Sequence, residues 1–156
     1  MSHWQAGKLN LACSLEVLRR ALLKIMPDWE KYIESDRGAG LGIRNYYTKR
    51  DQEGFSLVVR GGSHYKTRGT VAPELGYADV GFKREADGTW SVQIDPMGLP
   101  RSIKDLEGAV TQEATHINFI GMAEAEGYGI TKDEKEGDEV RIRLIVPVED
   151  QYKLRA

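Results

Sequence analysis

A β-hairpin over residues 77–95 is the clearest prediction from the pattern of apolar and polar positions. Two alternating segments flank a turn at residues 86–89 in the sequence YADVGFKREADGTWSVQID. The apolar face of this hairpin consists of Ala78, Val80, Phe82, Trp90, Val92 and Ile94. The second face consists of Tyr77, Asp79, Gly81, Ser91, Gln93 and Asp95, and its two carboxylates are expected to be solvated charges. Because antiparallel sheets commonly bury one face and leave the other in water, the second face is a candidate functional surface.

Residues 14–26 show the spacing of an amphipathic helix. One helical face carries Leu15, Leu18, Leu22 and Ile25. Ser14 stands where an N-cap belongs, and Pro27 prevents an easy continuation of the helix. We therefore expect a helix that begins after Ser14 and ends before Pro27.

A second helix is predicted to open at Ser102, directly after the Pro100–Arg101 pair. Its buried side is marked by Leu106, Val110, Ile117 and Ile120. Gly127 is expected to end it. Gly108 and Gly121 lower the helix propensity inside this segment, so both an unbroken and an interrupted helix are compatible with the sequence.

Three further segments alternate as strands do, namely residues 40–47, 55–60 and 139–148. In the second of them, Phe55, Leu57 and Val59 are expected to share a face. In the last of them, one face carries Val140, Ile142, Leu144 and Val146. Pro147 places the end of that strand at a sheet edge or an exit. The charged run before it, residues 131–139, is predicted to be a solvated turn.

The order of these elements favours an α+β fold, with a mainly antiparallel sheet and two helices packed on one face. A length of 156 residues fits a single domain over residues 1–156. The opposite, open face of the sheet should be polar and locally basic, with four arginines around one carboxylate. This face is expected to hold Arg44, Arg60, Asp79, Gln93, Arg141 and Arg143.

Composition and charge narrow the class of protein. Hydrophobic residues make up 40% and charged residues 29% of the chain, which is ordinary for a soluble globular protein. A net charge of −2 provides no whole-molecule field to recruit nucleic acid or anionic membrane. The single cysteine, Cys13, excludes an internal disulfide and fits a reducing compartment. No apolar run approaches the about 20 residues of a membrane span, and the first residues lack the apolar core of a secretory signal. We expect a cytoplasmic protein without membrane contact.

Known catalytic and cofactor motifs find no match in the sequence. The three histidines, His3, His64 and His116, have no metal-ligand spacing, and one cysteine cannot form a zinc ribbon. The phosphate-binding loop and the nucleophile elbow are both missing. A weaker idea is an enzyme that uses Asp79, His64 and an arginine clamp. We therefore predict no catalytic residue, no metal ligand and no cofactor.

The strongest binding signal is the segment RGGSHYKTRGT, residues 60–70. It combines cations, aromatic rings and glycines, in the residues Arg60, His64, Tyr65, Lys66 and Arg68. From residue 41 to residue 70 the chain has six Lys or Arg against two acidic residues, a local net charge of +4. Such a segment can dock an acidic protein, or it can contact phosphates and stack a base. A solvated loop is the plain alternative.

Several motifs occur in one order along the chain: MSHW, LEVLRRAL, YADVGFKREADGTWSVQID and TQEATHINFIGMAEAEGYGITKDE, followed by an arginine-rich last strand. In these motifs the chain resembles the hypothetical chloroplast open reading frame thirty-five family, also called domain of unknown function twelve fifty-seven. That family occurs in cyanobacteria, plastids, other bacteria and their viruses. The chain departs from its pattern at Ala114 and Thr115 and over residues 27–76. The resemblance implies no enzymatic activity; it implies an accessory role beside small partner proteins and AAA-type ATPases.

Together these observations predict a non-catalytic accessory or adaptor protein that offers its basic, polar sheet face and loop to a protein partner. The AAA-type ATPase system is one partner class that the resemblance implies. The alternative is a nucleic-acid-binding module that uses the same surface. The residues predicted to bind the partner are Arg44, Tyr46, Arg60, His64, Tyr65, Lys66, Arg68, Asp79, Arg141 and Arg143. Arginine and tyrosine are suited to such contacts because they anchor many protein interfaces.

Overall fold

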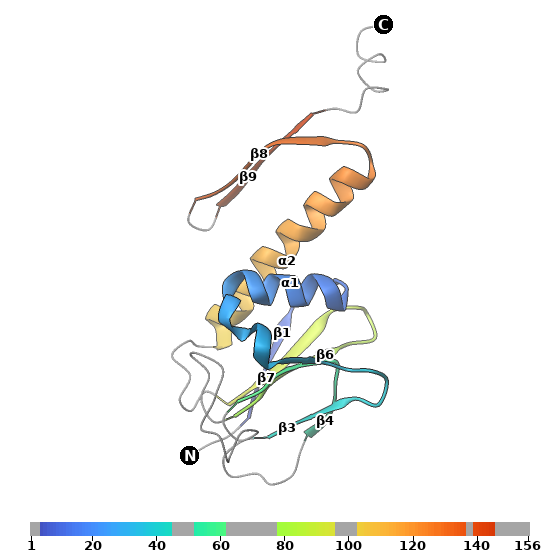
Figure 1. The fold of residues 1–156 in the computed structure, drawn as a ribbon, viewed down its shortest axis with the longest axis vertical. Coiled ribbons are helices and arrows are strands. Elements are labelled where there is room, and N and C mark those ends of the chain that lie inside the picture. Colours follow the sequence, from blue (N-terminus) through green and yellow to red (C-terminus); the bar gives the residue numbers. More distant parts are fainter. Residues whose placement is uncertain (1–3, 45–51, 62–77, 96–102, 137–138, 146–156) are drawn as a thin grey trace, which may run out of the picture.

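Antiparallel strands and two α-helices build the part of the chain that the computed structural model describes, residues 4–44, 52–61, 78–95, 103–136 and 139–145 (Figure 1). In chain order the elements are β1 (Gln5–Leu9), α1 (Leu15–Ile25), the 3-10 helix η1 (Pro27–Tyr32), β2 (Ile33–Ser35), β3 (Leu41–Ile43), β4 (Gln52–Phe55), β5 (Leu57–Val59), β6 (Val80–Arg84), β7 (Trp90–Ile94), α2 (Ile103–Ala125), β8 (Gly129–Glu136) and β9 (Glu139–Ile145). The main sheet has five strands in the order β1-β7-β6-β5-β2, and β3-β4 and β8-β9 form two separate ribbons. The predicted α+β class is confirmed.

The hairpin predicted over residues 77–95 is present as β6 and β7. Its register pairs Phe82 with Val92 and Gly81 with Gln93, so the apolar and polar faces are as predicted. Local chemistry closes the turn, because the carboxylate of Asp87 accepts hydrogen bonds from the backbone and hydroxyl of Thr89 at 3.0 and 2.5 Å. Gly88 supplies the positive φ of 84° that the turn needs.

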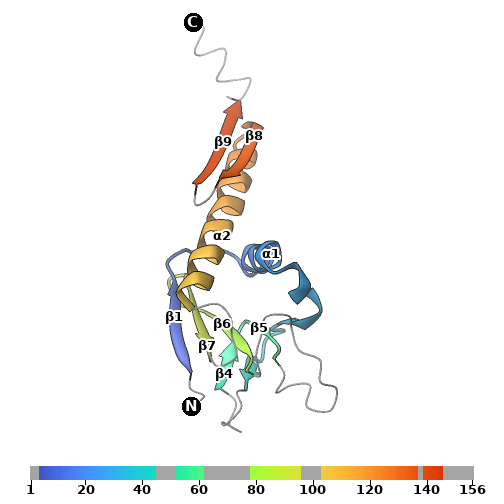
Figure 2. The ribbon, with the colours of Figure 1, turned by 90° about the vertical axis from the view of Figure 1, so that its left-hand side faces the viewer.

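The main core lies between the five-stranded sheet and both helices, which pack on the same face of the sheet as predicted (Figure 2). From the sheet the fully or nearly buried side chains are Leu9, Leu57, Val59, Val80, Phe82, Trp90, Val92 and Ile94. From the helices they are Leu18, Ala21, Leu22, Leu106, Val110 and Ala114. The apolar face of the hairpin thus meets the apolar stripes of α1 and α2, which removes all three from water.

Both helices begin or end where local chemistry requires it. The hydroxyl of Ser14 accepts a hydrogen bond from the backbone N–H of Val17 at 3.2 Å, which confirms the N-cap of α1. At the C-terminal end of α2, Gly127 has a positive φ of 86°. The N–H of Gly127 bonds to the carbonyl of Glu124, and the N–H of Tyr128 bonds to that of Ala123. This pair of bonds is a Schellman motif, and it stops the helix at the predicted glycine.

The second face of the hairpin is not open to solvent as expected, because the ribbon β3-β4 covers part of it. A second small core forms there from Ile43, Phe55 and Val58, with Trp4 and Leu41 packed against it. A Cβ atom on Gly81 would lie 2.6 Å from Cδ1 of Phe55, so this glycine makes room for the ring. The prediction that Phe55 shares a face with Leu57 and Val59 is therefore wrong; Ser56 separates β4 from β5 and the chain changes direction between them.

The C-terminal part of the chain also differs from the prediction. Most of the charged run 131–139 lies in β8 and not in a solvated turn, and β9 pairs with β8 and not with the main sheet. The ribbon β8-β9 contacts a helix on one side only, so most of its side chains are polar. For this reason the sequence of residues 131–139 resembles that of a solvated turn. In both views the end of α2 and this ribbon extend beyond the main sheet (Figures 1 and 2). We call residues 119–136 and 139–145 the distal arm.

Candidate partner-binding site

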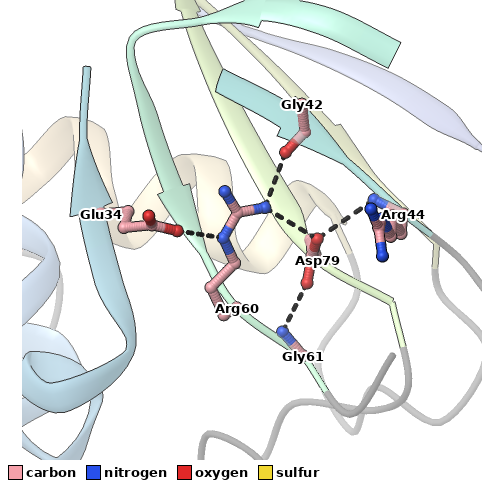
Figure 3. A network of polar contacts seen from close by, with 6 residues as sticks. All are labelled: Glu34, Gly42, Arg44, Arg60, Gly61 and Asp79. Atoms are coloured by element: carbon pink, nitrogen blue, oxygen red, sulfur yellow. Dashed lines mark hydrogen bonds and ion pairs between the residues drawn. The ribbon is translucent and has the colours of Figure 1, made fainter. Parts of the chain in front are cut away.

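A buried carboxylate, Asp79, joins three parts of the chain near the start of β6 (Figure 3). Its Oδ2 atom accepts hydrogen bonds from the backbone N–H of Arg44 and from Nη1 of Arg60, both at 3.1 Å. Its Oδ1 atom accepts a third bond from the backbone N–H of Gly61 at 2.7 Å. Asp79 therefore connects the end of β3, the end of β5 and the start of β6.

The guanidinium of Arg60 is used within the fold. Its side chain is 11% exposed, and it forms ion pairs with the buried Asp79 and with the half-exposed Glu34. A further bond from Nη1 to the carbonyl of Gly42, at 2.6 Å, ties the same group to β3. Because carboxylates and a carbonyl surround this cation, little of its charge is left for a ligand.

Burial raises the pKa of Asp79 above its ordinary value of 3.8, although the bonds from Gly61, Arg60 and Arg44 oppose the shift. A carboxyl with a raised pKa is a common feature of acid–base catalysts. Here, however, the side chain is fully buried and both oxygens accept bonds from the protein. The geometry is that of a structural link between strands.

The structure brings together three of the residues predicted to bind a partner and separates the others. Arg44, Arg60 and Asp79 meet in the network of Figure 3, where the side chain of Arg44 is exposed. Arg141 and Arg143 lie on β9, so the expected face of four arginines around one carboxylate does not exist. The remaining predicted residues lie outside the described residues: Tyr46, His64, Tyr65, Lys66 and Arg68.

The two carboxylates of the hairpin's polar face are also placed differently from the prediction. Asp79 and Asp95 are not solvated charges, because both are buried, with 0% and 1% of their surface exposed. At Asp79 the ends of β3 and β5 cover the sheet, which sequence alternation could not reveal.

The distal arm carries a different kind of surface. Among the described residues, the large hydrophobic side chains that are strongly exposed are Phe119 (46%), Met122 (68%) and Ile145 (47%). All three belong to the arm, two on α2 and one on β9. Single exposed apolar residues are normal on protein surfaces, so the informative feature of these three is that all of them lie on one projecting part of the chain.

Exposed arginines lie on the same arm. On β9 the side chains of Arg141 and Arg143 are exposed, whereas the intervening Ile142 is half-buried. Arg141 forms an ion pair with Glu139 at 3.3 Å, and exposed pairs of this kind are weak and easily exchanged. In the register of the ribbon, β9 residues Arg141 and Arg143 are paired with Glu134 and Lys132 of β8.

An open groove of about 500 Å³ separates α1 from the arm. On its floor, Nε2 of His116 lies 2.7 Å from Oδ1 of Asp133, although the two groups are not aligned as a hydrogen bond. This contact ties β8 to α2. Arg20 and Lys24 line the groove from α1, and the buried Glu113 lines it from α2. Positive and negative groups are mixed in the groove, so it has no single preferred ligand charge.

The described residues contain no cluster of three or more His, Cys, Asp or Glu side chains able to hold a metal ion. Within the same part of the chain, no helix combines the length and the apolar character needed to cross a membrane. Comparison of the chain with protein-family models, curated proteins and solved structures finds no match. The surface of the chain itself is therefore the basis for inferring its function.

Sequence reasoning missed Phe119 and Met122, although a signal for them was present. On a helical wheel both residues fall away from the buried stripe of Leu106, Val110 and Ile117. An apolar residue on the outer side of an amphipathic helix is informative when a second one lies one turn along it. Ile145 gave no such signal, because the pairing of β9 could not be predicted.

Proposed function

We propose that this protein is a non-catalytic accessory protein that binds a protein partner through its distal arm. The observation that carries this proposal is the position of Phe119, Met122 and Ile145: the strongly exposed large hydrophobic side chains of the described residues all lie on the arm. A partner that covered them would gain the free energy of removing apolar surface from water.

The composition of the arm supports a protein as the partner. Aromatic residues, methionine and arginine are enriched at protein interfaces, and the arm exposes Phe119, Met122, Arg141 and Arg143 together. Methionine and phenylalanine give a nucleic-acid backbone no charge to contact, whereas they fit an apolar pocket of a protein. The resemblance to the chloroplast open reading frame thirty-five family adds the AAA-type ATPase system as the class of partner to examine first.

The segment predicted to bind a partner, residues 60–70, is a candidate for a second contact, apart from the arm. Of its cations, Arg60 is taken up by Asp79 and Glu34, so its contribution is structural. Lys66 and Arg68 stay candidates for a second contact, and they are also the residues through which nucleic acid would bind. The arm and this segment can be tested independently because they belong to different parts of the chain.

The proposal is tested by capture of partners from native lysate of the source cells, with and without nuclease, using wild type and two variants. Met122→Lys puts a charge into the exposed apolar group, and Ala86→Lys adds the same charge to the exposed turn between β6 and β7. We expect one stoichiometric protein partner in both nuclease conditions. Met122→Lys should reduce its capture at least about tenfold, because a central interface residue contributes more than about 1.4 kcal/mol.

Ala86→Lys should capture the partner as wild type does, since residue 86 does not belong to the arm. Equal capture by Met122→Lys and wild type would contradict the arm as the binding surface. Loss of every captured protein after nuclease treatment would favour the alternative, a nucleic-acid-binding module. Both variants change exposed positions, so unchanged thermal unfolding is the control that each one is folded.

A further inference from the structure

The strand edges of this protein are not equally protected. At one edge of the main sheet, the backbone N–H of Lys8 in β1 donates to the carboxylate of Glu107 in α2 at 3.1 Å. At the other edge, β2 is only three residues long. Both are recognised ways to prevent unwanted strand pairing. The main sheet is therefore blocked at Lys8 on the β1 edge and has a short strand at the β2 edge.

Among the described residues, nothing comparable protects the β9 side of the ribbon β8-β9. β9 is seven residues long and, among the described residues, pairs with β8 alone. β8 is the strand that lies against α2, where His116 contacts Asp133. The outer edge of β9 thus presents a row of backbone N–H and carbonyl groups. A two-stranded ribbon is marginally stable by itself, so a third strand would stabilise it.

The side chains of β9 indicate which strand would fit. Along its outer face the order is Glu139, Arg141, Arg143 and Ile145, all exposed. Residues directly opposite each other in a sheet interact, and opposite charges are favoured there. The complementary strand carries a basic residue, two acidic residues and an apolar residue at alternate positions. Its net charge is negative, which matches the excess of Arg141 and Arg143 over Glu139 on β9.

A second copy of the chain is the other occupant to consider. Antiparallel pairing of two β9 strands centred on Ile142 would place Arg141 opposite the other copy's Arg143 twice, which is destabilising. Pairing centred on Arg141 would place that residue opposite itself, and Glu139 opposite the other copy's Arg143 twice. Both registers contain a like-charge pair, whereas an acidic partner strand places an opposite charge against each of Glu139, Arg141 and Arg143, so we take the acidic strand as the occupant.

We infer that β9 accepts an extended, acidic segment of the protein partner as a third strand, by backbone hydrogen bonds along its outer edge. This inference rests on the proposed function and specifies how the partner binds. Backbone hydrogen bonds supply the attachment in this mode, and the alternating side chains supply the specificity. The exposed Ile145 on β9 meets the apolar end of the added strand.

The test uses two synthetic peptides and isotope-labelled full-length protein. The first peptide, acetyl-Val-Thr-Glu-Thr-Glu-Thr-Lys-amide, is complementary to β9 in the antiparallel sense. The second, acetyl-Val-Thr-Lys-Thr-Lys-Thr-Glu-amide, has the same length and spacing with the charges reversed. Backbone amide chemical shifts and hydrogen exchange are followed during titration to millimolar peptide. We expect the acidic peptide to shift the amides of Glu139–Ile145 and to slow the exchange of the outward-facing ones.

The charge-reversed peptide should bind at least about fivefold more weakly, since three opposite-charge cross-strand pairs become like-charge pairs. The double variant Arg141→Glu/Arg143→Glu should invert this preference, and inversion is a gain that an unfolded ribbon cannot produce. Equal binding of both peptides, no shift at β9, or shifts that move with protein concentration before any peptide is added would each overturn the inference.

The two proposals can fail separately. If the peptides leave β9 unchanged while Met122→Lys still abolishes capture of the partner, the arm is the docking surface and strand addition is wrong. If the acidic peptide binds β9 but Met122→Lys captures the partner normally, the apolar group on the arm is not the binding site.

Discussion

Replacing Asp79 by asparagine should destabilise the protein strongly, although this change removes only one charge. The carboxylate accepts bonds from two backbone N–H groups and from Arg60, and it is fully buried. An asparagine side chain at this position would not serve all three donors, because it has one acceptor oxygen and its NH2 group would face an N–H donor. At least one buried donor therefore loses its partner in Asp79→Asn.

The size of the effect follows from burial. Removing one partner of a buried ion pair costs about 3–5 kcal/mol, because the other charge and its neighbours stay buried without compensation. For a chain of this length, 1 kcal/mol corresponds to a shift of about 2–4 °C in Tm, so a fall of roughly 6–20 °C is expected. Glu34→Gln is the matched control, since Glu34 pairs with the same Arg60 but is half-exposed. It should cost about 0–1 kcal/mol.

Urea unfolding followed by tryptophan fluorescence measures both variants, because Trp29 and Trp90 are buried and report on the core. The free energies of unfolding in water are compared at pH 7 for wild type, Asp79→Asn and Glu34→Gln. If Asp79→Asn lost no more than Glu34→Gln, water would be reaching the network, and the argument that Asp79 joins the strands in a dry environment would be refuted.

The difference in stability between wild type and Asp79→Asn should change with pH in a defined direction. Burial raises the pKa of Asp79 in the folded state above its ordinary value of 3.8. The folded protein then holds this proton more tightly than the unfolded chain, so the contribution of the carboxyl to stability is complete below about pH 3.8 and declines as pH rises through the folded-state pKa. The stability advantage of wild type over Asp79→Asn should therefore narrow as pH rises from this value, and a widening advantage would contradict the direction of the shift.

Two further predictions concern the cores. Gly81→Ala should destabilise the protein by about 1–3 kcal/mol, because the added Cβ would lie 2.6 Å from the ring of Phe55. In a Phe55→Ala background the same substitution should be near neutral. A double-mutant cycle measured by urea unfolding tests this coupling, and equal costs in both backgrounds would contradict it. Burial raises the pKa of the Cys13 thiol, so alkylation of Cys13 in the folded protein should be much slower than in urea; similar rates in both states would show that the thiol is accessible.

Local signals in the sequence were sufficient for the hairpin, the N-cap at Ser14 and the stop at Gly127. Each of these depends on residues a few positions apart, where a period of two, a capping hydroxyl or a positive φ decides the outcome. The packing of both helices on one face followed equally, because an apolar stripe on a helix and an apolar face on a sheet have to bury each other.

Contacts between residues distant in the chain decided how the remaining strands pair and which side chains meet. Alternation indicated that Asp79 and Gly81 share a face with Gln93, but it could not indicate that Phe55 would fill the space above Gly81 or that Arg60 would meet Asp79. Likewise, the alternation of β9 is the same whether the strand joins the main sheet or pairs with β8. The charged run 131–139 is compatible with a strand once α2 extends beyond the sheet and supports one side of it. By itself, the sequence determined the hairpin and the two helices with their buried faces; the tertiary structure decided how the other strands pair, which polar faces became buried and which apolar residues stayed exposed, because those outcomes depend on neighbours distant in the chain.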